Sequence, residues 1–362
     1  MSELLVRVVQ IDTIEPHPNA DRLEIVKIGG WQIVSGKGNY KVGDLAIHVP
    51  PDAMVPKTLA DEWGVTQYLS WRANAEKGRV KAVRLRGVAS HGFLSPNSLG
   101  NEVGENLAET LKIEKYEELV PIGMQAGQIA RKHPLFHTYT SIENLRNYPN
   151  KLCYDEPLVV IEKTHGTNSR LGWVRTQREN GTAELELAIG THRTQRKTED
   201  SGVYGLPWEK HQNAFSNILD LFLKKDDIII NSLIFFGEIF GAGVQDLHYG
   251  AKSAKDWRLF DIAVNGKYLY YPVLEHLAKE YGLPLMPEIA RGYFDFERLV
   301  ELAQGNTTFA DSHIREGVVI RPMIHESTWS QGDLDPHPRR CIFKLINDDY
   351  LLRKNKDASE YH

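Results

Sequence analysis

The sequence predicts an α+β protein of two domains, with antiparallel sheets in both. Residues 1 to about 98 hold short alternating apolar runs separated by Gly, Pro and Asn, among them VRVVQIDTI, RLEIVKI, WQIVSG and LAIHVP. Short strands at this spacing indicate a small antiparallel barrel or sandwich. From residue 151 onwards, strand-like runs such as LVVIEK, DIIINSLIFFGEIF and EGVVIRP alternate with helix-like stretches such as YPVLEHLAKEYG, an order typical of α+β domains.

Composition narrows the class of protein. The chain has 362 residues, enough for two domains that each bury a core. Its net charge of -5 argues against coating of nucleic acid by bulk charge, so any such contact must be local. Cys153 and Cys341 are the only cysteines, which excludes a disulfide framework and a cysteine metal site. Neither a membrane span nor a secretory signal is visible, so we expect a cytoplasmic protein without membrane contact, and no protein partner is evident.

The N-terminal phrases HPNADRLEIVKI, QIVSG and NYKVGDLAIHVPPDA resemble the OB-fold modules that bind tRNA in some aminoacyl-tRNA synthetases. This resemblance predicts an OB-fold nucleic-acid-binding β-barrel, with its exit segment, over residues 1–125. Basic residues alternate with apolar ones near its end, at Arg79, Lys81, Arg84 and Arg86. We predict that they lie along one strand and contact a phosphate backbone. A solvated basic face is the alternative.

A lysine at the end of a buried strand marks the second domain, residues 126–362. The stretch KTHGTN, residues 163–168, follows the apolar run Leu158 to Ile161. The sheet holds the backbone of Lys163, and Gly166 allows the chain to turn close to whatever the amine attacks. The position therefore suits a nucleophile.

This stretch resembles motif I of the covalent nucleotidyltransferases, the superfamily of RNA ligases, DNA ligases and mRNA capping enzymes. The form KxHGTN, rather than KxDGxR, is similar to the RNA ligases that seal double strands. The words KIEKYEELVP and YTSIENLRN resemble the segment that joins the OB domain to the ligase core in the RNA ligase 5 family. The resemblance implies an ATP-grasp-like ligase core with antiparallel sheets, and an ATP-dependent RNA ligase activity.

The resemblance also implies roles for the residues around motif I. Lys163 attacks the α-phosphate of ATP and carries AMP, and Glu162 recognises the adenine amino group unless it is a solvated edge carboxylate. His165 is a further catalytic residue or a satisfied turn histidine, and Asn168 faces ribose, phosphate or a metal-bound water. A free lysine titrates near ~10.4, so desolvation and nearby cations must lower the pKa of the attacking amine. We therefore predict a metal ion and a second lysine beside it.

Two later stretches match further motifs. AIGTHRTQRK, residues 188–197, resembles motif Ia. Its Arg193 would bind the nucleic-acid strand, and His192, Arg196 and Lys197 lie nearby in sequence. For Arg196 and Lys197 a solvated basic loop is the alternative. FFGEIFG, residues 235–241, resembles motif III. Its Glu238 follows an apolar strand, where a carboxylate needs partners. Ribose hydroxyls are the predicted partners, and a buried salt bridge is the alternative.

The last motifs supply an aromatic face, a metal ligand and a cation. WRLFDIAV, residues 257–264, resembles motif IIIa. Trp257 or Phe260 would therefore stack on adenine, with packing in the core as the alternative for both rings. Asp261 is expected to be structural. Glu316 in EGVVIRP resembles the motif IV ligand of Mg²⁺ or Mn²⁺. Lys344 in CIFKLIN resembles the motif V lysine that neutralises the α-phosphate.

Motif V commonly has two lysines spaced KxK, but Ile342 stands in the first position. Whether Arg340 substitutes for that lysine is left open by the sequence. DNA ligases and capping enzymes usually carry a barrel after motif V, whereas only residues 345–362 follow here. We therefore expect an RNA ligase that joins 3′-hydroxyl and 5′-phosphate ends, at nicks in a duplex or in RNA bridged by a complementary strand. A GTP-dependent capping-type nucleotidyltransferase and a non-catalytic tRNA-binding protein are the alternatives.

Overall fold

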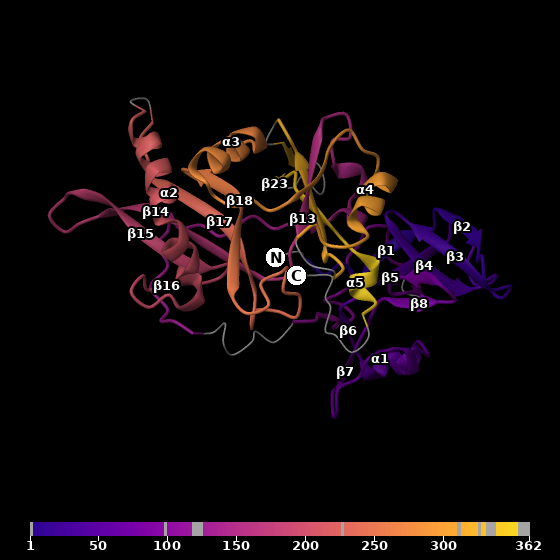
Figure 1. The fold of residues 1–362 in the computed structure, drawn as a ribbon. Coiled ribbons are helices and arrows are strands. Elements are labelled where there is room, and N and C mark those ends of the chain that lie inside the picture. The colour runs from indigo at the N-terminus through magenta and orange to yellow at the C-terminus, as the bar shows by residue number, and fades with distance from the viewer. Residues whose placement is uncertain are drawn as a thin grey trace. The chain divides into compact units, whose positions relative to one another are not determined.

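The computed structural model describes residues 3–97, 100–117, 126–225, 228–309, 313–324, 327–330 and 338–353. The chain divides into two compact units (Figure 1). The first unit consists of residues 1–119, 142–152 and 344–362, and the second of residues 120–141 and 153–343. The boundary predicted between residues 125 and 126 falls at the edge of residues 118–125, which lie outside the described part. In the described part, no helix is both long and apolar enough to cross a membrane.

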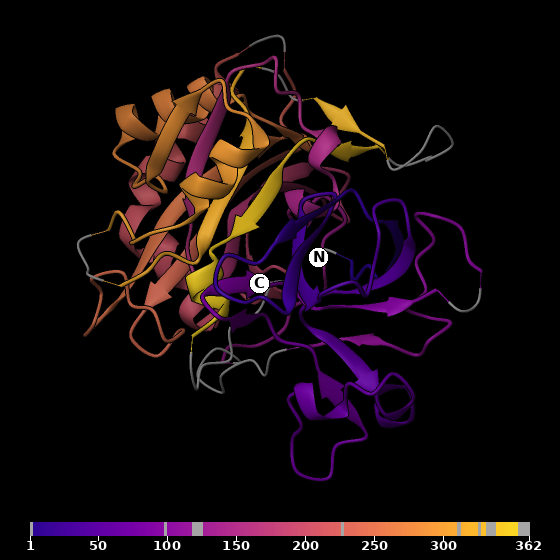
Figure 2. The same cartoon turned by 90° about the vertical axis from the view of Figure 1, so that its right-hand side faces the viewer.

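The first unit is built from short antiparallel strands, as the sequence predicted. One three-stranded sheet has the order β1-β5-β10, with β1 (Arg7–Gln10), β5 (Leu45–Val49) and β10 (Phe93–Pro96). A second has the order β2-β3-β4, with β2 (Thr13–Pro16), β3 (Leu23–Ile28) and β4 (Trp31–Gly36). The other elements are β11 (Glu114–Lys115), β6 (Ala53–Pro56) and β7 (Lys77–Arg79) in a third sheet, the pair β8 (Val83–Leu85) and β9 (Val88–Ser90), and helix α1 (Lys57–Glu62). Figure 2 shows these strands in indigo and purple.

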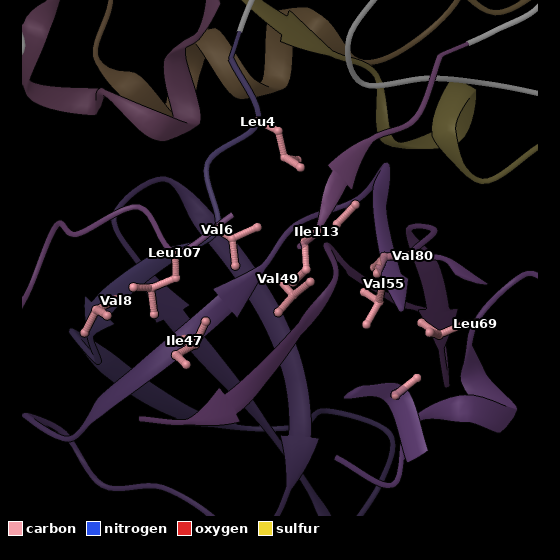
Figure 3. Packing of buried hydrophobic residues seen from close by; sticks show 12 residues of the cluster. Leu4, Val6, Val8, Ile47, Val49, Val55, Leu69, Val80, Leu107 and Ile113 are labelled. Atoms are coloured by element: carbon pink, nitrogen blue, oxygen red, sulfur yellow. The ribbon is translucent and has the colours of Figure 1, made fainter. Parts of the chain in front are cut away.

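The core of the first unit follows from the alternation of apolar residues along its strands. Figure 3 shows one cluster of this core, in which Val6, Val8, Ile47, Val49 and Val55 are buried together. Burying one such side chain contributes about 1.5 to 3 kcal/mol before the entropic cost of ordering it. Because a strand has a period of two, these inward residues fix which polar residues face outwards.

Two segments distant in sequence belong to the first unit, and hydrogen bonds show why. Arg146 donates from Nη1 to the carbonyl of Gly30 at 2.9 Å, and Trp31 donates from Nε1 to Oδ1 of Asn147 at 2.9 Å. In helix α5 (Asp348–Leu351), the Asp348 carboxylate lies 2.9 Å from Nε2 of His91. Strand β12 (Glu143–Asn144) also belongs to this unit, and the chain passes from the second unit to the first within β24 (Phe343–Ile346).

The second unit contains a six-stranded antiparallel sheet covered by helix α2 (Leu206–Leu223). Its order is β16-β15-β14-β17-β18-β19. Phe215 of α2 packs on Phe235 and Trp257, with ring centroids 4.7 and 5.7 Å apart. The strands are β14 (Thr167–Gln177), β15 (Ala183–Thr191), β16 (Gln195–Arg196), β17 (Ser232–Gly241), β18 (Lys255–Val264) and β19 (Lys267–Tyr268).

A second antiparallel set in this unit carries the predicted nucleophile. Strand β13 (Leu158–Lys163) pairs with β20 (Glu288–Gly292) on one side and with β21 (Gly317–Pro322) on the other. Residues 158–162 of β13 are all buried, which explains why this strand reads as a continuous apolar run rather than an alternating one. The remaining elements are α3 (Tyr271–Tyr281), α4 (Phe296–Ala303), β22 (Thr328–Trp329) and β23 (Arg339–Arg340).

Candidate active site

Lys163 and Glu316 form an ion pair that the strand register dictates. Lys163 ends β13 and stands opposite Gly317, the first residue of β21, so Glu316 lies beside it. The Lys163 Nζ is 2.8 Å from Oε1 of Glu316. The Glu316 side chain is fully buried, whereas 14% of the Lys163 side chain is exposed. A buried carboxylate needs a counter-charge, and here a lysine that is still open to solvent provides it.

Gly166 lets the turn after Lys163 pack directly against β17. A Cβ atom at this position would lie 2.3 Å from the carbonyl oxygen of Ile239 and 2.9 Å from Cγ of Glu238. Real Cβ atoms do not approach a backbone oxygen so closely, so any larger residue would push the turn away from the strand. The Gly166 amide also donates a hydrogen bond to Glu238. The glycine is therefore needed for close contact with β17, whereas the sequence had assigned it to the approach of a target.

Glu238 brings a second carboxyl group to Lys163. The pKa of Glu238 is raised to about 8, mainly by burial; the charge of Glu316 also acts to raise it, while Lys163 and the Gly166 amide act to lower it. Among the described residues Glu238 forms no ion pair, which argues against the buried salt bridge considered as its alternative role. Its strand partner in the register is Asn168 of β14.

Asn168, Glu238 and Glu316 together fit a divalent cation that binds through oxygen. The Asn168 Oδ1 atom is buried and accepts no hydrogen bond from the described residues. A carboxamide oxygen and two carboxyl groups are the donors that Mg²⁺ and Mn²⁺ take, with water and substrate phosphate completing the coordination. In the described ranges no group of three or more His, Cys, Asp or Glu residues is placed to hold a metal ion by itself.

His165 is fixed by two contacts from the loop between β17 and β18. Its Nε2 atom is 3.4 Å from Oδ1 of Asp246, and its backbone N–H donates to the hydroxyl of Tyr249 at 2.7 Å. The ring is buried, and a catalytic role for it stays a prediction. Sequence reasoning missed Asp246 and Tyr249, because they lie in an irregular loop that matches no motif.

Glu162 points away from Lys163, as strand alternation predicts, but it is not a solvated carboxylate. Its side chain is buried and accepts hydrogen bonds from the hydroxyl of Thr307 and from the amide and hydroxyl of Thr308, at 2.5, 2.8 and 2.6 Å. The carboxylate thus ties the loop after α4 to β13. Its predicted contact with adenine stays a prediction.

The stacking role predicted for Trp257 is wrong in this structure. The ring is completely buried under α2, and its Nε1 donates to Oγ of Ser169 at 2.9 Å. A Cβ atom at Gly237 would lie 2.2 Å from the indole, so the ring fills the space that this glycine leaves. Phe260 is half-buried and packs edge-on against Tyr139 at 4.9 Å. Its stacking on a base stays a prediction.

Asp261 is structural, as expected, and it binds Arg340. The Asp261 Oδ2 atom is 2.6 Å from Arg340 Nη1 and 3.0 Å from Arg321 Nη1, and it accepts from the Tyr139 hydroxyl at 2.8 Å. The two guanidinium groups hold the pKa of Asp261 below its ordinary value, although burial acts in the opposite direction and is the largest single influence. The Arg340 guanidinium also lies 4.0 Å from the Tyr268 ring. It is therefore committed to this buried network.

Family membership follows from comparison with known proteins. A family model described as RNA ligase matches residues 156–346, more than half of the chain. The chain belongs to the RNA ligase family. An OB-fold domain model matches residues 5–97, which confirms the predicted fold of the N-terminal domain. No curated protein matches the chain at a significant level.

Solved structures of an RNA ligase from Naegleria gruberi share the fold. A variant bound to ATP and Mn matches with a TM-score of 0.75 at 20% identity, covering 96% of this chain and 98% of that one. The complex with PPi matches with a TM-score of 0.72 at 21% identity, over 96% and 98% of the two chains. A variant with AMP and Mn also has a TM-score of 0.72 at 21% identity, with coverage of 96% and 98%. The predicted α+β ligase core preceded by an OB fold is thereby confirmed.

In this RNA ligase family member, two of the basic residues predicted to bind nucleic acid form ion pairs within the chain. The expectation that Arg79 contacts nucleic acid is wrong, because its buried guanidinium is 2.6 Å from Asp52 and 3.6 Å from the Tyr116 ring. Arg84 is exposed and lies 2.7 Å from Asp349. The predicted single strand is also wrong, because β7 ends at Arg79, β8 contains Arg84, and Arg86 lies in the following turn with φ 47°. Lys81 and Arg86 are exposed.

The motif Ia loop also contains both buried and exposed basic residues. Arg196 is buried and donates to the carbonyl of Gly127 at 2.8 Å, so it is structural. Burial lowers the pKa of His192 to about 4, so this ring is neutral at physiological pH. Arg193 and Lys197 are exposed. Lys344 of motif V lies on β24, where 2% of it is exposed, and its contact with the α-phosphate stays a prediction.

Proposed function

We propose that this chain is an ATP-dependent RNA ligase that joins 3′-hydroxyl and 5′-phosphate ends through a lysyl-AMP on Lys163. The observation that carries the proposal is the Lys163 amine, still open to solvent and held 2.8 Å from the buried Glu316. Membership of the RNA ligase family supports it. The similar Naegleria gruberi structures contain ATP, AMP, PPi and Mn, which supports ATP and a divalent metal here.

The first step is attack of the Lys163 nitrogen on the α-phosphorus of ATP. A P–N bond forms, the P–O bond to the β-phosphate breaks, and pyrophosphate leaves with that electron pair. The amine must first lose a proton, which it can release to water because part of its side chain is open to solvent. A divalent cation held by Glu316, Glu238 and Asn168 would supply positive charge to the phosphate oxygens. Lys344 would provide the second cation that the motif order predicts.

The next two steps transfer AMP and seal the strand. An oxygen of the RNA 5′-phosphate attacks the AMP phosphorus, the P–N bond breaks, and the Lys163 amine is released. The 3′-hydroxyl then attacks the activated 5′-phosphate, forms the phosphodiester and expels AMP. We place the reaction at nicks in a duplex or in RNA bridged by a complementary strand. The absence of a protein partner and a cytoplasmic location both stay predictions.

An exposed basic surface on the second unit suits the RNA backbone. The amide of Ala130 donates to the carbonyl of Gln195 at 3.0 Å, and the amide of His133 donates to Oε1 of Gln195 at 2.8 Å. These bonds lay residues 128–133 along the motif Ia loop. Four basic residues of these two paired segments are exposed: Arg131, Lys132, Arg193 and Lys197. Clustered cations of this kind bind phosphate without regard to sequence.

Labelling with ATP carrying a radioactive α-phosphate tests the function. Lys163→Ala should abolish the protein-AMP adduct and still seal a nicked RNA duplex that is already adenylated, because only the first step needs the amine. Lys279→Ala, an exposed lysine in α3, serves as the control and should label normally. Label retained by Lys163→Ala would contradict the assignment of the nucleophile.

The same assay separates the alternatives. Labelling by GTP instead of ATP would indicate a capping-type enzyme, and no adduct with either nucleotide in the presence of Mg²⁺ or Mn²⁺ would favour a non-catalytic tRNA-binding protein. Sealing should then be measured on nicked duplexes with RNA or DNA in each strand position. Joining that requires RNA at the nick agrees with the proposal, whereas joining of DNA alone contradicts it.

A further inference from the structure

The loop between β17 and β18 contains a turn that its sequence does not favour. Tyr249 has φ 50° and Gly250 has φ 83°, and the amide of Ala251 donates to the carbonyl of His248 at 2.9 Å. Positive φ at both central residues characterises a type I′ turn, which prefers Asn or Gly at the first of them. A tyrosine in this conformation is strained, because its Cβ crowds the following carbonyl. Such strain persists only where the surroundings enforce it.

Contacts from two other segments enforce the position of Tyr249. Its buried ring packs edge-on against Phe240 of β17 and His313, with ring centroids 5.7 and 4.7 Å apart, and it contacts Phe309 at 5.1 Å. The Tyr249 amide donates to Nε2 of His313 at 3.1 Å. Nε2 is thus an acceptor, so the neutral ring carries its proton on Nδ1 and donates it to the carbonyl of Ile314 at 2.8 Å. The ring is held between β17 and the segment that leads to Glu316.

The hydroxyl of Tyr249 reaches the turn that follows the nucleophile. It accepts the His165 amide at 2.7 Å, in the middle of the KTHGTN stretch. His165 is buried, so its N–H would have no water to replace this acceptor. Burial raises the pKa of Tyr249, and the charges of Glu316, Glu162 and Glu238 raise it further, which keeps the phenol neutral.

We propose that Tyr249 is a positioning residue for the adenylation of Lys163. Its hydroxyl fixes the His165 amide and thereby the turn between Lys163 and Gly166, which orients the attacking amine. A phenylalanine would fill the same space, so packing alone does not account for the hydroxyl, and an asparagine would suit the turn better. The inference rests on the proposed function, because it concerns the first step of that reaction.

Single-turnover formation of lysyl-AMP in Tyr249→Phe tests the proposal. We expect the rate at saturating ATP to fall about tenfold or more, because a small misplacement of a nucleophile is costly. The ATP concentration for half-saturation should stay within about twofold, since no contact with ATP is removed. Tyr249→Asn, which relieves the turn but lacks the phenol, should not recover the rate. The control is Tyr271→Phe, which removes another buried tyrosine hydroxyl, 3.4 Å from Glu288, and should react like the unmodified chain.

Hydrogen exchange of the peptide over residues 163–168 provides a readout that does not depend on activity. Deuterium uptake there should be faster in Tyr249→Phe than in Tyr271→Phe, while both variants keep their melting temperatures within a few degrees. Normal adenylation by Tyr249→Phe, or a Tyr249→Phe chain that unfolds, would overturn the positioning role. If the unmodified chain forms no adduct, the proposed function is overturned instead. Even then, unchanged exchange at residues 163–168 in Tyr249→Phe would reject the contribution of Tyr249 to this turn.

Discussion

Glu238→Gln tests the electrostatics of the site through stability rather than activity. The pKa of Glu238 is raised from its ordinary value of 4.5 to about 8, mainly by burial. Below pH 4.5 the carboxyl group is protonated in both the folded and the unfolded chain, so it contributes no pH dependence. As the pH rises from 4.5 to 8, the unfolded chain ionises first, and the folded state loses stability relative to it. Above pH 8 the loss is complete and constant.

The size of this effect follows from the two pKa values. The difference between 4.5 and about 8 corresponds to a loss of at most about 5 kcal/mol. Partial exposure of the side chain and relaxation around the charge reduce the cost, so we expect about 2 to 3 kcal/mol. Glutamine has nearly the same shape and no charge. Glu238→Gln should therefore be more stable than the unmodified chain by this amount at pH 9 and equally stable near pH 4.

Thermal and urea unfolding of the nucleotide-free protein between pH 4 and pH 9 measures the effect. Glu179→Gln is the control, because Glu179 is an exposed glutamate in the β14–β15 hairpin of the same unit and should leave the pH profile unchanged. If Glu238 also takes part in adenylation, as we propose, the stabilised variant should form less lysyl-AMP. Parallel pH profiles for Glu238→Gln and the unmodified chain would refute the reasoning, because they would show that Glu238 titrates normally.

Two further predictions concern residues whose roles the structure changed. Asp52→Asn should destabilise the chain by about 3 to 5 kcal/mol in urea unfolding, because it removes the carboxylate charge that lies 2.6 Å from the buried Arg79 guanidinium. A loss of nicked-RNA affinity with unchanged stability would instead favour the original nucleic-acid role of Arg79. Trp257→Phe should cost about 2 kcal/mol of stability, through lost volume and the lost indole hydrogen bond to Ser169 Oγ, while the ATP concentration for half-saturation of labelling stays unchanged. A large rise in that concentration with normal stability would restore the stacking role.

Lys163 and Glu316 could be singled out from the sequence because they stand at strand ends. Lys163 ends β13, Glu316 precedes β21, and antiparallel pairing of these strands makes the two residues neighbours. Glu238 was recognised as a carboxylate within an apolar run, an unfavourable place that implies partners. Alternation along one strand and the order of the motifs contain this information. These residues could be named without knowing the strand register, but only the register shows how close to one another they lie.

The errors arose where a residue's partner is distant in sequence. Arg79 reads as a solvent-facing cation on its strand, and only the folded first unit shows Asp52 beside it. Trp257 reads equally well as a core or a stacking residue, and the position of α2 decides between them. Tyr249 gave no signal at all, because an irregular loop has no periodicity, and its contacts come from segments on both sides of it in sequence.

Arg340 illustrates how local geometry overrides spacing. If β23 and β24 were one strand, Arg340 and Lys344 would lie on the same face, and the arginine could replace the absent motif V lysine. Instead the chain is interrupted after Arg340, where the amide of Ile342 donates back to the Arg340 carbonyl at 2.9 Å. The guanidinium is bound by Asp261, whose second counter-ion is Arg321. Removing Arg340 from this network would leave Asp261 with one counter-charge in a fully buried site, which is costly. Arg340 is therefore not available to replace the absent motif V lysine, and the role of Lys344 stays a prediction.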